Sequence, residues 1–529
     1  MQAWGRSIIR VFPVLLLVLM LSSTITCLSQ SYDYWFMLLG TPDYEVSRGV
    51  TVSPDGSVII VGTITYSRGT TGGFIAKLDA NGNVIWSKTL SASGFGYDVL
   101  PVTLLENVVC DPNGNIYVVG ECGDNRVVSA ALILKLYANG SIAWSKAYGG
   151  KYSWGFYDVV LGRDGNIVVV GKCPEKFSST YYYSDYLVAK LDPKGNLMFA
   201  VSFGIPDGSD IATCVTVDEN NSIYVAGISQ SGEEIDTILA KFNETGSPIK
   251  ARIIGDRGYF EYPFSIIVDE SSVYVCGGSL YYNSYSDKNL TGILIKMDRD
   301  LSISSDDIMI KCGEGEASFY SISLDIENKV LYTAGYTYAG ESGGSDAFIA
   351  AFDANTLNPS RAWSIGTSMD EFLLEGTLSY RLNKTFLAGY VNAGGRMGEE
   401  ALLIKFDPSI PSKLVWVNES SWESVKVATI SLNTSIWDPV TNVFLTDNNI
   451  TSILNSTLVS SLTEPELSIT MDPWSPEILL AVPYLPYIVG ESKGTGVFGG
   501  EASCVRTLVL QAVLSLAVIL FLAVARKRK

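Results

Sequence analysis

The chain has 529 residues, with 37 basic and 55 acidic side chains and a net charge of −18. This balance disfavours nucleic-acid binding, which needs clustered cations. Histidine is absent, which removes the commonest metal ligand and the commonest general base.

The N-terminus has the pattern of a secretory signal peptide. Arg6 and Arg10 precede a short apolar run, Val11 to Leu21, and small residues near Ser29 fit a cleavage site. Cys27 leaves a lipoprotein alternative open, although Thr24 to Thr26 match a lipid-attachment site poorly. We therefore expect residues 1–29 to be a signal peptide and the chain to be exported.

The residues that follow repeat a string of short strands joined by tight turns. In Asp111 to Gly150, a preceding strand is followed by IYVVG, ALILKL and IAWSKAY, with Asn-Gly or Gly-Gly turns between and after them. One marker of the repeat is the glycine that closes the second strand: Gly62, Gly120, Gly171, Gly227, Gly277, Gly335 and Gly389. The other is a third-strand run such as FIAKLD, LVAKLD or LLIKFD. Four strands repeated every 50 or so residues predict an all-β fold, a seven-bladed β-propeller over residues 30–412.

These repeats resemble the SBBP family of β-propeller repeats of bacterial and archaeal surface proteins. The matching segments include SPDGSVIIVGT, LDANGNVIWSK and GRDGNIVVVGK, and the resemblance covers about Tyr44 to Asp407. It weakens in the fifth to seventh repeats. The resemblance implies a propeller and extracellular placement, but it implies no activity.

A propeller ring must be closed, because its first and last sheets otherwise have exposed edges. Asp33 to Gly40 reads as an outer strand with no strands of its own before it, and Trp35 takes the place of Trp86 and Trp144. We expect this N-terminal strand to complete the last blade. Lys413 to Val417 is the competing candidate.

The repeat markers end after the seventh third strand. Residues 413–503 are rich in Ser, Thr and Asn and are expected to form a β-rich stalk or small β domain, with a degenerate eighth blade as the weaker alternative. Residues 507–525 are apolar and precede Arg526 to Lys529, which predicts one transmembrane helix and a basic cytoplasmic tail at 526–529. The expected location is the cell membrane, with most of the chain outside.

Nine Asn-x-Ser/Thr sequons fit a glycosylated exported protein. They lie at Asn139, Asn220, Asn243, Asn289, Asn383, Asn418, Asn433, Asn449 and Asn455. Cys122 and Cys173 occupy the same place in neighbouring repeats, which leaves an inter-blade disulfide and buried free thiols both open.

The turns of the form Asp-x-Asn-Gly-Asn, such as the one at Asp111, superficially resemble calcium loops. They lie between two strands and lack a distal bidentate Glu, which favours plain hairpin turns. We expect no cofactor, with calcium as the alternative.

Two groups of loop-face residues are candidates for binding. Acids begin the first strands, at Glu45, Asp98, Asp158, Asp210, Glu261, Glu316 and Asp370, and a second group begins the third strands, at Asp185, Asp236, Asp346 and Glu400. Aromatic side chains, of which Trp154, Tyr182, Tyr282 and Tyr336 are the chief candidates, occur in loops expected on the same face. The acids fit either bonds to loop amides or an acidic mouth, and the aromatics fit either self-packing loops or a sugar or protein site.

No catalytic group stands out. The sequence favours a non-catalytic surface protein that binds carbohydrate or protein. The alternative is an extracellular lyase or glycosidase, which would need two carboxylates about 5–10 Å apart in a cleft.

Overall fold

The computed structural model describes residues 35–407 and six short strands between 413 and 482. Its internal gaps up to residue 407 are 67–68, 94–101, 126–127, 150–152, 175–182, 206–207, 232–233, 256–257, 282–289, 303–306, 313–316, 339–343, 368, 380–383 and 393–398. The described residues belong to one compact unit, Tyr34–Pro483. The predicted signal peptide and transmembrane helix lie outside them. Among the described residues, no helix has the length and apolarity needed to cross a bilayer.

The sheets repeat one antiparallel unit of four strands, with consecutive strands paired. In chain order the units begin with β2 (Tyr44–Val52), β3 (Val58–Thr65), β4 (Thr71–Leu78) and β5 (Val84–Ser93), then β6 (Val102–Cys110), β7 (Ile116–Asn125), β8 (Val128–Leu136) and β9 (Ile142–Gly149). Next come β10 (Gly155–Leu161), β11 (Ile167–Pro174), β12 (Ser184–Leu191) and β13 (Leu197–Phe203), then β14 (Ser209–Val217), β15 (Ile223–Ser231), β16 (Glu234–Phe242) and β17 (Pro248–Ile254).

The remaining units follow the same plan. They are β18 (Tyr259–Val268), β19 (Ser272–Tyr281), β20 (Leu290–Asp298) and β21 (Ile308–Cys312), then β22 (Ala317–Asp325), β23 (Val330–Thr337), β24 (Asp346–Asp353) and β25 (Pro359–Gly366). The last unit contains β26 (Asp370–Ser379), β27 (Lys384–Asn392) and β28 (Glu399–Phe406), with β1 (Trp35–Gly40) as its fourth strand.

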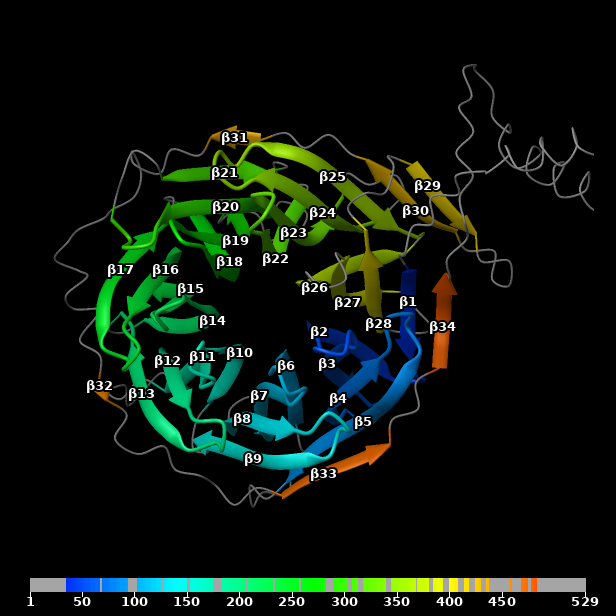
Figure 1. Ribbon diagram of the computed structural model, residues 1–529, viewed down its shortest axis with the longest axis horizontal. Coiled ribbons are helices and arrows are strands. Elements are labelled where there is room, and N and C mark those ends of the chain that lie inside the picture. The colour runs from blue at the N-terminus through cyan, green and yellow to red at the C-terminus, as the bar shows by residue number, and fades with distance from the viewer. Residues whose placement is uncertain are drawn as a thin grey trace, which may run out of the picture. The chain divides into compact units, whose positions relative to one another are not determined.

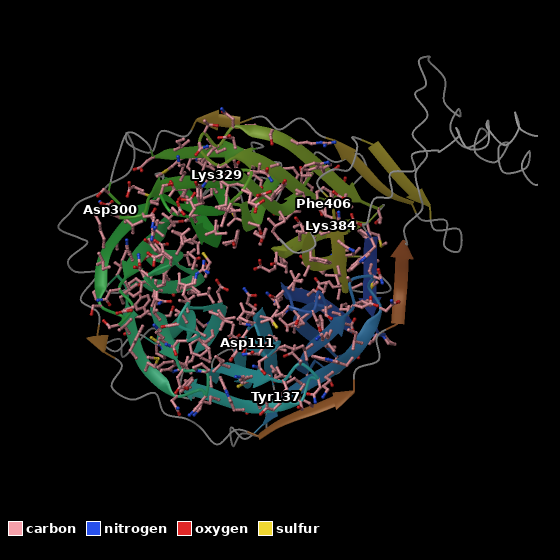
Figure 2. The ribbon with its side chains drawn as sticks, in the orientation of Figure 1. Asp111, Tyr137, Asp300, Lys329, Lys384 and Phe406 are labelled. Atoms are coloured by element: carbon pink, nitrogen blue, oxygen red, sulfur yellow. The ribbon has the colours of Figure 1, made fainter. Side chains whose placement is uncertain are left out.

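The units form a closed ring, in which the first strand of each lies nearest the centre (Figure 1). Each first strand packs against the next one along the chain, and β26 packs against β2. Figure 2 shows side chains on every sheet of this ring, with Asp111 and Tyr137 beginning two turns of one sheet. This arrangement of radial antiparallel sheets is a β-propeller.

The ring is closed by the N-terminal strand, as the sequence predicts. β1 pairs with β28, with Trp35 opposite Lys405. Trp35 Nε1 donates to Ala80 O, the bond that Trp86 makes with Ala138 O in the next sheet. Lys405 Nζ donates to the same carbonyl of Ala80, so the last sheet is tied to a turn of the first.

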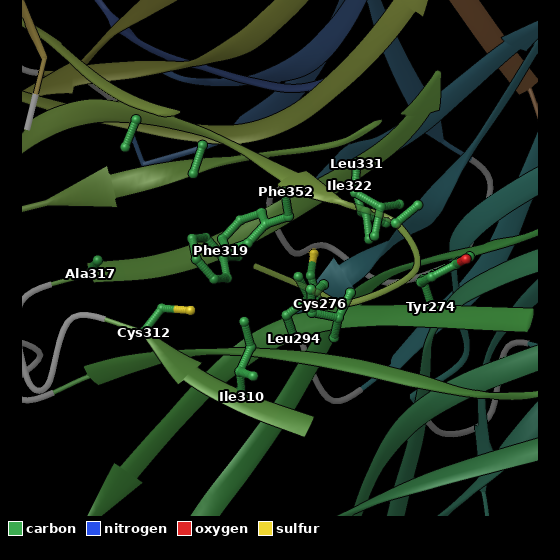
Figure 3. Close-up of a cluster of buried hydrophobic side chains, with 14 of the residues drawn as sticks. Tyr274, Cys276, Leu294, Ile310, Cys312, Ala317, Phe319, Ile322, Leu331 and Phe352 are labelled. Carbon is green, nitrogen blue, oxygen red and sulfur yellow. The ribbon is translucent and has the colours of Figure 1, made fainter. Parts of the chain in front are cut away.

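The core lies between facing sheets and is apolar. One cluster joins Tyr274, Cys276 and Leu294 to Phe319 and Phe352 of the next sheet (Figure 3). An equivalent cluster at the closing seam packs Trp35 and Leu403 against strands of the first sheet. Burial of these large side chains is the main stabilising contribution to the ring.

The C-terminal segment differs from the expected stalk. Its strands are β29 (Lys413–Val417), β30 (Ser424–Thr429), β31 (Thr434–Ile436), β32 (Thr457–Leu458), β33 (Ser468–Pro473) and β34 (Glu477–Val482). β29 pairs with β30, while β30, β31, β32, β33 and β34 pair with β25, β21, β13, β5 and β1 respectively. These strands follow the outside of the ring in reverse chain order (Figure 1). Outer strands leave unpaired amides and carbonyls, and this C-terminal belt supplies partners for them.

Candidate functional site

A bulge in every first strand shapes the centre of the ring. The register shifts opposite the second-strand glycine, so one residue of each first strand is left between paired positions. The bulge brings a carbonyl onto the glycine: a Cβ at Gly389 would lie 1.8 Å from Phe372 O, and one at Gly120 would lie 1.9 Å from Leu104 O. The repeated glycine is therefore required by the bulge.

The residues left in the bulges are all half-buried, on the innermost strands. We call them the axial residues: Arg48, Glu106, Tyr157, Thr213, Phe264, Tyr320 and Leu374. Two pairs of consecutive members are in contact, and the first is the ion pair between Arg48 Nη1 and Glu106 Oε2 at 3.3 Å. The rings of Phe264 and Tyr320 stack with centroids 4.2 Å apart.

One half of the axis is charged and polar. Beside the Arg48–Glu106 pair, the ammonium group of Lys172 lies 5.5 Å from the ring centroid of Tyr157. Such a cation is attracted by the negative face of the ring. This half is built by the first three units of the chain.

On the other half, the axial residues Phe264 and Tyr320 belong to a set of aromatic side chains in continuous contact. We call them the aromatic arc: Tyr262, Phe264, Tyr320, Tyr336, Tyr338, Phe372 and Tyr390. The arc runs from β18 to β27 through three neighbouring sheets. All members except Tyr336 have intermediate exposure, so part of each of these side chains reaches the surface.

Asp158 lies beside the axial residues and joins three first strands. Its Oδ1 accepts from Asn107 Nδ2 of β6 at 2.7 Å and from the amide of Val159, and its Oδ2 accepts from the amide of Val215 of β14 at 2.7 Å. Burial raises the pKa of Asp158 to about 7, even though these bonds favour its charged form. The sequence predicts Asp158 near the start of a strand, on the loop face close to the central channel. In the structure it directly follows the bulge, and its bonds reach the first strands on both sides.

Asp158 acts in turn on a second carboxyl, that of Glu375. Burial, and then the charge of Asp158, raises the pKa of Glu375 to about 8. Glu375 Oε1 accepts from the Ser321 hydroxyl at 3.0 Å and from the amide of Gly376 at 2.9 Å. The two carboxyls are therefore electrostatically coupled, and each is held by amide or hydroxyl donors.

Three of the predicted acids occupy one equivalent position at the seams between sheets. Glu45, Asp210 and Glu261 each lie two residues before the residue opposite the second-strand glycine, and all are fully buried. In the last unit Glu371, rather than Asp370, holds this position. Asp370 instead accepts from the amide of Ser345. These acids are parts of the interior and do not form an exposed acidic mouth; Asp98 and Glu316 lie outside the described residues.

The predicted aromatic residues divide in the same way. Tyr336 is a member of the aromatic arc, whereas Trp154 packs on Gly149. The amide of Trp154 donates to Ser129 O, and the hydroxyl of Ser129 donates to Trp154 O. Trp154 therefore has a structural role, and Tyr182 and Tyr282 lie outside the described residues. Sequence reasoning missed Tyr262, Phe264, Tyr320, Phe372 and Tyr390. The first four share one signal, an aromatic residue within two positions of the first-strand bulge, whereas Tyr390 directly follows the second-strand glycine.

The Asp-x-Asn-Gly-Asn turns use their oxygens internally. Asp111 Oδ1 accepts from the amides of Asn113 and Asn115, and its Oδ2 accepts from Asn115 Nδ2. Asp79 does the same in its own turn. Within the described parts of the chain, no group of three or more Asp, Glu, Cys or His side chains could hold a metal ion.

The cysteines that the structure describes are free thiols, including Cys122 and Cys173. Both are buried in apolar clusters, so an inter-blade disulfide between them is absent. Of the predicted sequons, Asn139, Asn220 and Asn243 are described, and all three lie in turns. The remaining sequons lie outside the described residues.

No family model and no curated protein matches the chain. Solved structures that resemble it include a protein of unknown function from Dyadobacter fermentans DSM 18053 (10% identity, TM-score 0.42, covering 71% of this chain and 99% of that one). They also include the polysaccharide lyase Uly1 (9% identity, TM-score 0.44, covering 68% of this chain and 89% of that one). A third is a thermostable family-43 glycoside hydrolase (9% identity, TM-score 0.29, covering 61% of this chain and 91% of that one). The likeness is too distant to carry an argument about function.

Proposed function

We propose that this protein is an exported, membrane-anchored β-propeller of seven blades that binds carbohydrate at its axis without catalysis. The aromatic arc is the observation that carries the proposal. Flat rings with polar tips stack on the C–H faces of sugars and offer hydrogen bonds at their edges. Protein ligands are the competing class, and they are an outcome of the test below.

The polar half of the axis supports the same proposal. The side chain of Arg48 is 39% exposed and that of Glu106 is 14% exposed, so both can form hydrogen bonds with a ligand that displaces water. A sugar lying on Tyr320 and Phe264 would have these charged groups on the opposite side. The chain's net charge of −18 favours neutral or basic glycans over polyanionic ones.

The anchoring part of the proposal rests on sequence. The apolar run 507–525 with its basic tail supports a single membrane-spanning helix, and residues 1–29 support export. The seven glycine markers support the blade count, and the SBBP resemblance agrees with a surface location.

The test is glycan binding by the purified full-length chain, measured on an array of neutral, amino and acidic sugars. Tyr320→Ala and Phe264→Ala should each weaken retention at least tenfold, because each removes a stacking face. Tyr137→Ala is the matched control, since Tyr137 is an exposed tyrosine in a turn between β8 and β9. Retention of proteins but of no sugar, lost in the same two variants, would replace carbohydrate by a protein ligand.

A second candidate function is hydrolysis or elimination on an extracellular polysaccharide. The coupled carboxyls of Asp158 and Glu375, with pKa values near neutral, favour it. Their bonds to backbone amides favour a structural role instead. Release of reducing ends from a retained glycan, abolished in Glu375→Gln, would establish the enzyme.

A further inference from the structure

At the seam where the last sheet meets the first, two buried glutamates lie on neighbouring strands. Glu45 is on β2 and Glu400 is on β28, and these strands pack together. The two residues are 0% and 3% exposed. Burial raises the pKa of both side chains, that of Glu400 to about 8, and the charge of Glu45 is the next contribution to the pKa of Glu400.

Each carboxyl presents one oxygen without a partner. Glu45 Oε1 accepts from the hydroxyl of Thr41, but Glu45 Oε2 and Glu400 Oε2 have no hydrogen-bond partner among the described residues. Buried polar atoms are otherwise nearly always bonded. The seam therefore holds two orphan oxygens, one from each carboxyl.

Basic groups on the surrounding strands are engaged elsewhere. On β2, Arg48 pairs with Glu106. On β28, Lys405 bonds to Ala80 O, and on β27, Lys384 pairs with Asp407 at 2.6 Å.

The other charged groups around the seam are acids. Asp43 acts on Glu45, Glu399 is the neighbour of Glu400, β6 contributes Glu106, and β26 carries Asp370, Glu371 and Glu375. β1 and β3 have no charged residue. Among the described groups, nothing positive neutralises the pair.

Two neighbouring buried carboxyls without donors to both of their oxygens disfavour a second negative charge, so the seam needs a bound cation or proton. A calcium ion takes six to eight oxygen ligands, and in the described residues no group of three or more Asp, Glu, Cys or His side chains could hold a metal ion. One proton needs only two oxygens, one to carry it and one to accept it. The two orphan oxygens match that requirement.

Asp210 occupies the position of Glu45 at another seam, and there both carboxyl oxygens accept hydrogen bonds. Asp210 accepts from the amide of Ile205 and from the hydroxyl of Ser229. Its partner across the seam, Asp185, lies close by, because a Cβ on Gly204 would be 2.2 Å from Asp210 Oδ2 and 2.8 Å from Asp185 Oδ1. The closing seam lacks such donors to the second oxygen of Glu45.

We propose that Glu45 and Glu400 share one proton that clasps the ring at its closing seam, and that loss of this proton in alkaline solution loosens the seam. The proton lies between the two Oε2 atoms, bonded to one and accepted by the other. Its release leaves two carboxylates facing each other on strands that join the two ends of the propeller. The clasp is independent of any ligand at the axis.

The direction of the pH dependence follows from proton counts. An unfolded glutamate releases its proton near pH 4.5, whereas the folded pair keeps it up to about pH 8. Between these values the folded state binds one more proton, so stability falls as pH rises. The unfolding equilibrium constant rises by up to about tenfold per pH unit from this pair alone.

The test compares Glu400→Gln with the wild type in urea unfolding of the full-length chain from pH 5 to pH 8. Glutamine keeps the shape and donates an N–H in place of the shared proton, without titrating. The wild-type unfolding constant should rise by up to about 1,000-fold more than that of the variant over this range. Other buried acids titrate in both proteins and cancel in the comparison.

Glu45→Gln should flatten the profile in the same way, and Glu244→Gln, an exposed control, should leave it unchanged. Should both seam variants fail to fold, infrared difference spectra between the wild type and the milder Glu400→Asp separate the pair from Asp158 and Glu375, which titrate in the same range. A protonated carboxyl band that is lost near pH 8 in the wild type and is altered in Glu400→Asp supports the clasp, and an identical band in both proteins overturns it. Parallel profiles for wild type and Glu400→Gln also overturn it, as does stabilisation by calcium chloride that requires Glu400.

Discussion

The closing seam and the axis both contain carboxyl groups, but their surroundings differ. At the seam, Glu45 and Glu400 are buried on packed strands, and the charge of Glu45 contributes to the raised pKa of Glu400. At the axis, Asp158 accepts from Asn107 and from the amides of two strands. The donors around an acid, rather than the acid itself, therefore decide whether it fastens strands together or keeps an unpartnered oxygen. The difference also separates the interior, which holds the ring, from the half-exposed axis, which can meet a ligand.

The largest effect is expected from removing the closing strand's anchor. Trp35 is 6% exposed and packs into the apolar cluster of the closing seam. Trp35→Ala should lower the free energy of unfolding by about 4 kcal/mol, because it empties a large buried volume. Trp86→Ala, in the equivalent strand of the first sheet but half-exposed, should cost clearly less in urea unfolding. Equal losses would mean that the closing seam is no more critical than an ordinary one.

A smaller loss is expected at the glycine that faces the bulge in the last sheet. Gly389→Ala places a Cβ 1.8 Å from Phe372 O, so the bulge must shift. The expected cost is about 3 kcal/mol. Gly69→Ala is a useful contrast for thermal unfolding, because a Cβ there meets nothing within 4 Å and only its positive φ of 80° is strained. A cost at Gly389 no larger than at Gly69 would contradict the close approach.

These two positions also show how far the sequence could predict the structure. Gly389 and Trp35 belong to repeated patterns, so the strands, the turns and the ring-closing strand could be inferred from local periodicity. The bulge could not, because its register is set by pairing between strands. From sequence, Glu45 and Asp158 fit bonds to loop amides or an acidic mouth equally in kind. The register separates them, because Glu45 precedes the bulge of its strand and Asp158 directly follows it.

The C-terminal belt illustrates a second limit. Apolar and polar residues alternate from Val425 to Leu432, which indicates a strand, but this alternation does not identify the strand with which it pairs. Its partner, β25, lies about 60 residues earlier in the chain, and the pairing depends on the open edge that the ring presents. The aromatic arc was missed for a related reason. Tyr320 and Phe264 are 56 positions apart and become neighbours only when the sheets close into a ring.

At the axis, Asp158→Ala should lower the free energy of unfolding by about 2 kcal/mol. The change leaves the amides of Val159 and Val215 and the side chain of Asn107 without their acceptor. Urea unfolding at pH 8 measures the cost, and Glu244→Ala at the exposed surface is the control. A cost below about 0.5 kcal/mol, the range of ordinary surface changes, would show that Asp158 does not fasten the three strands.

The smallest effect is expected for Arg48, and it tests whether the axis is open to solvent. Its ion pair with Glu106 joins a 39% exposed side chain to a 14% exposed one. A double-mutant cycle of Arg48→Ala and Glu106→Ala should give a coupling energy below about 1 kcal/mol, reduced further by salt, because water screens exposed pairs. A coupling of several kcal/mol that does not respond to salt would mean that water is excluded from this half of the axis. The charged groups would then belong to the interior, and they could not meet a sugar lying on the aromatic arc.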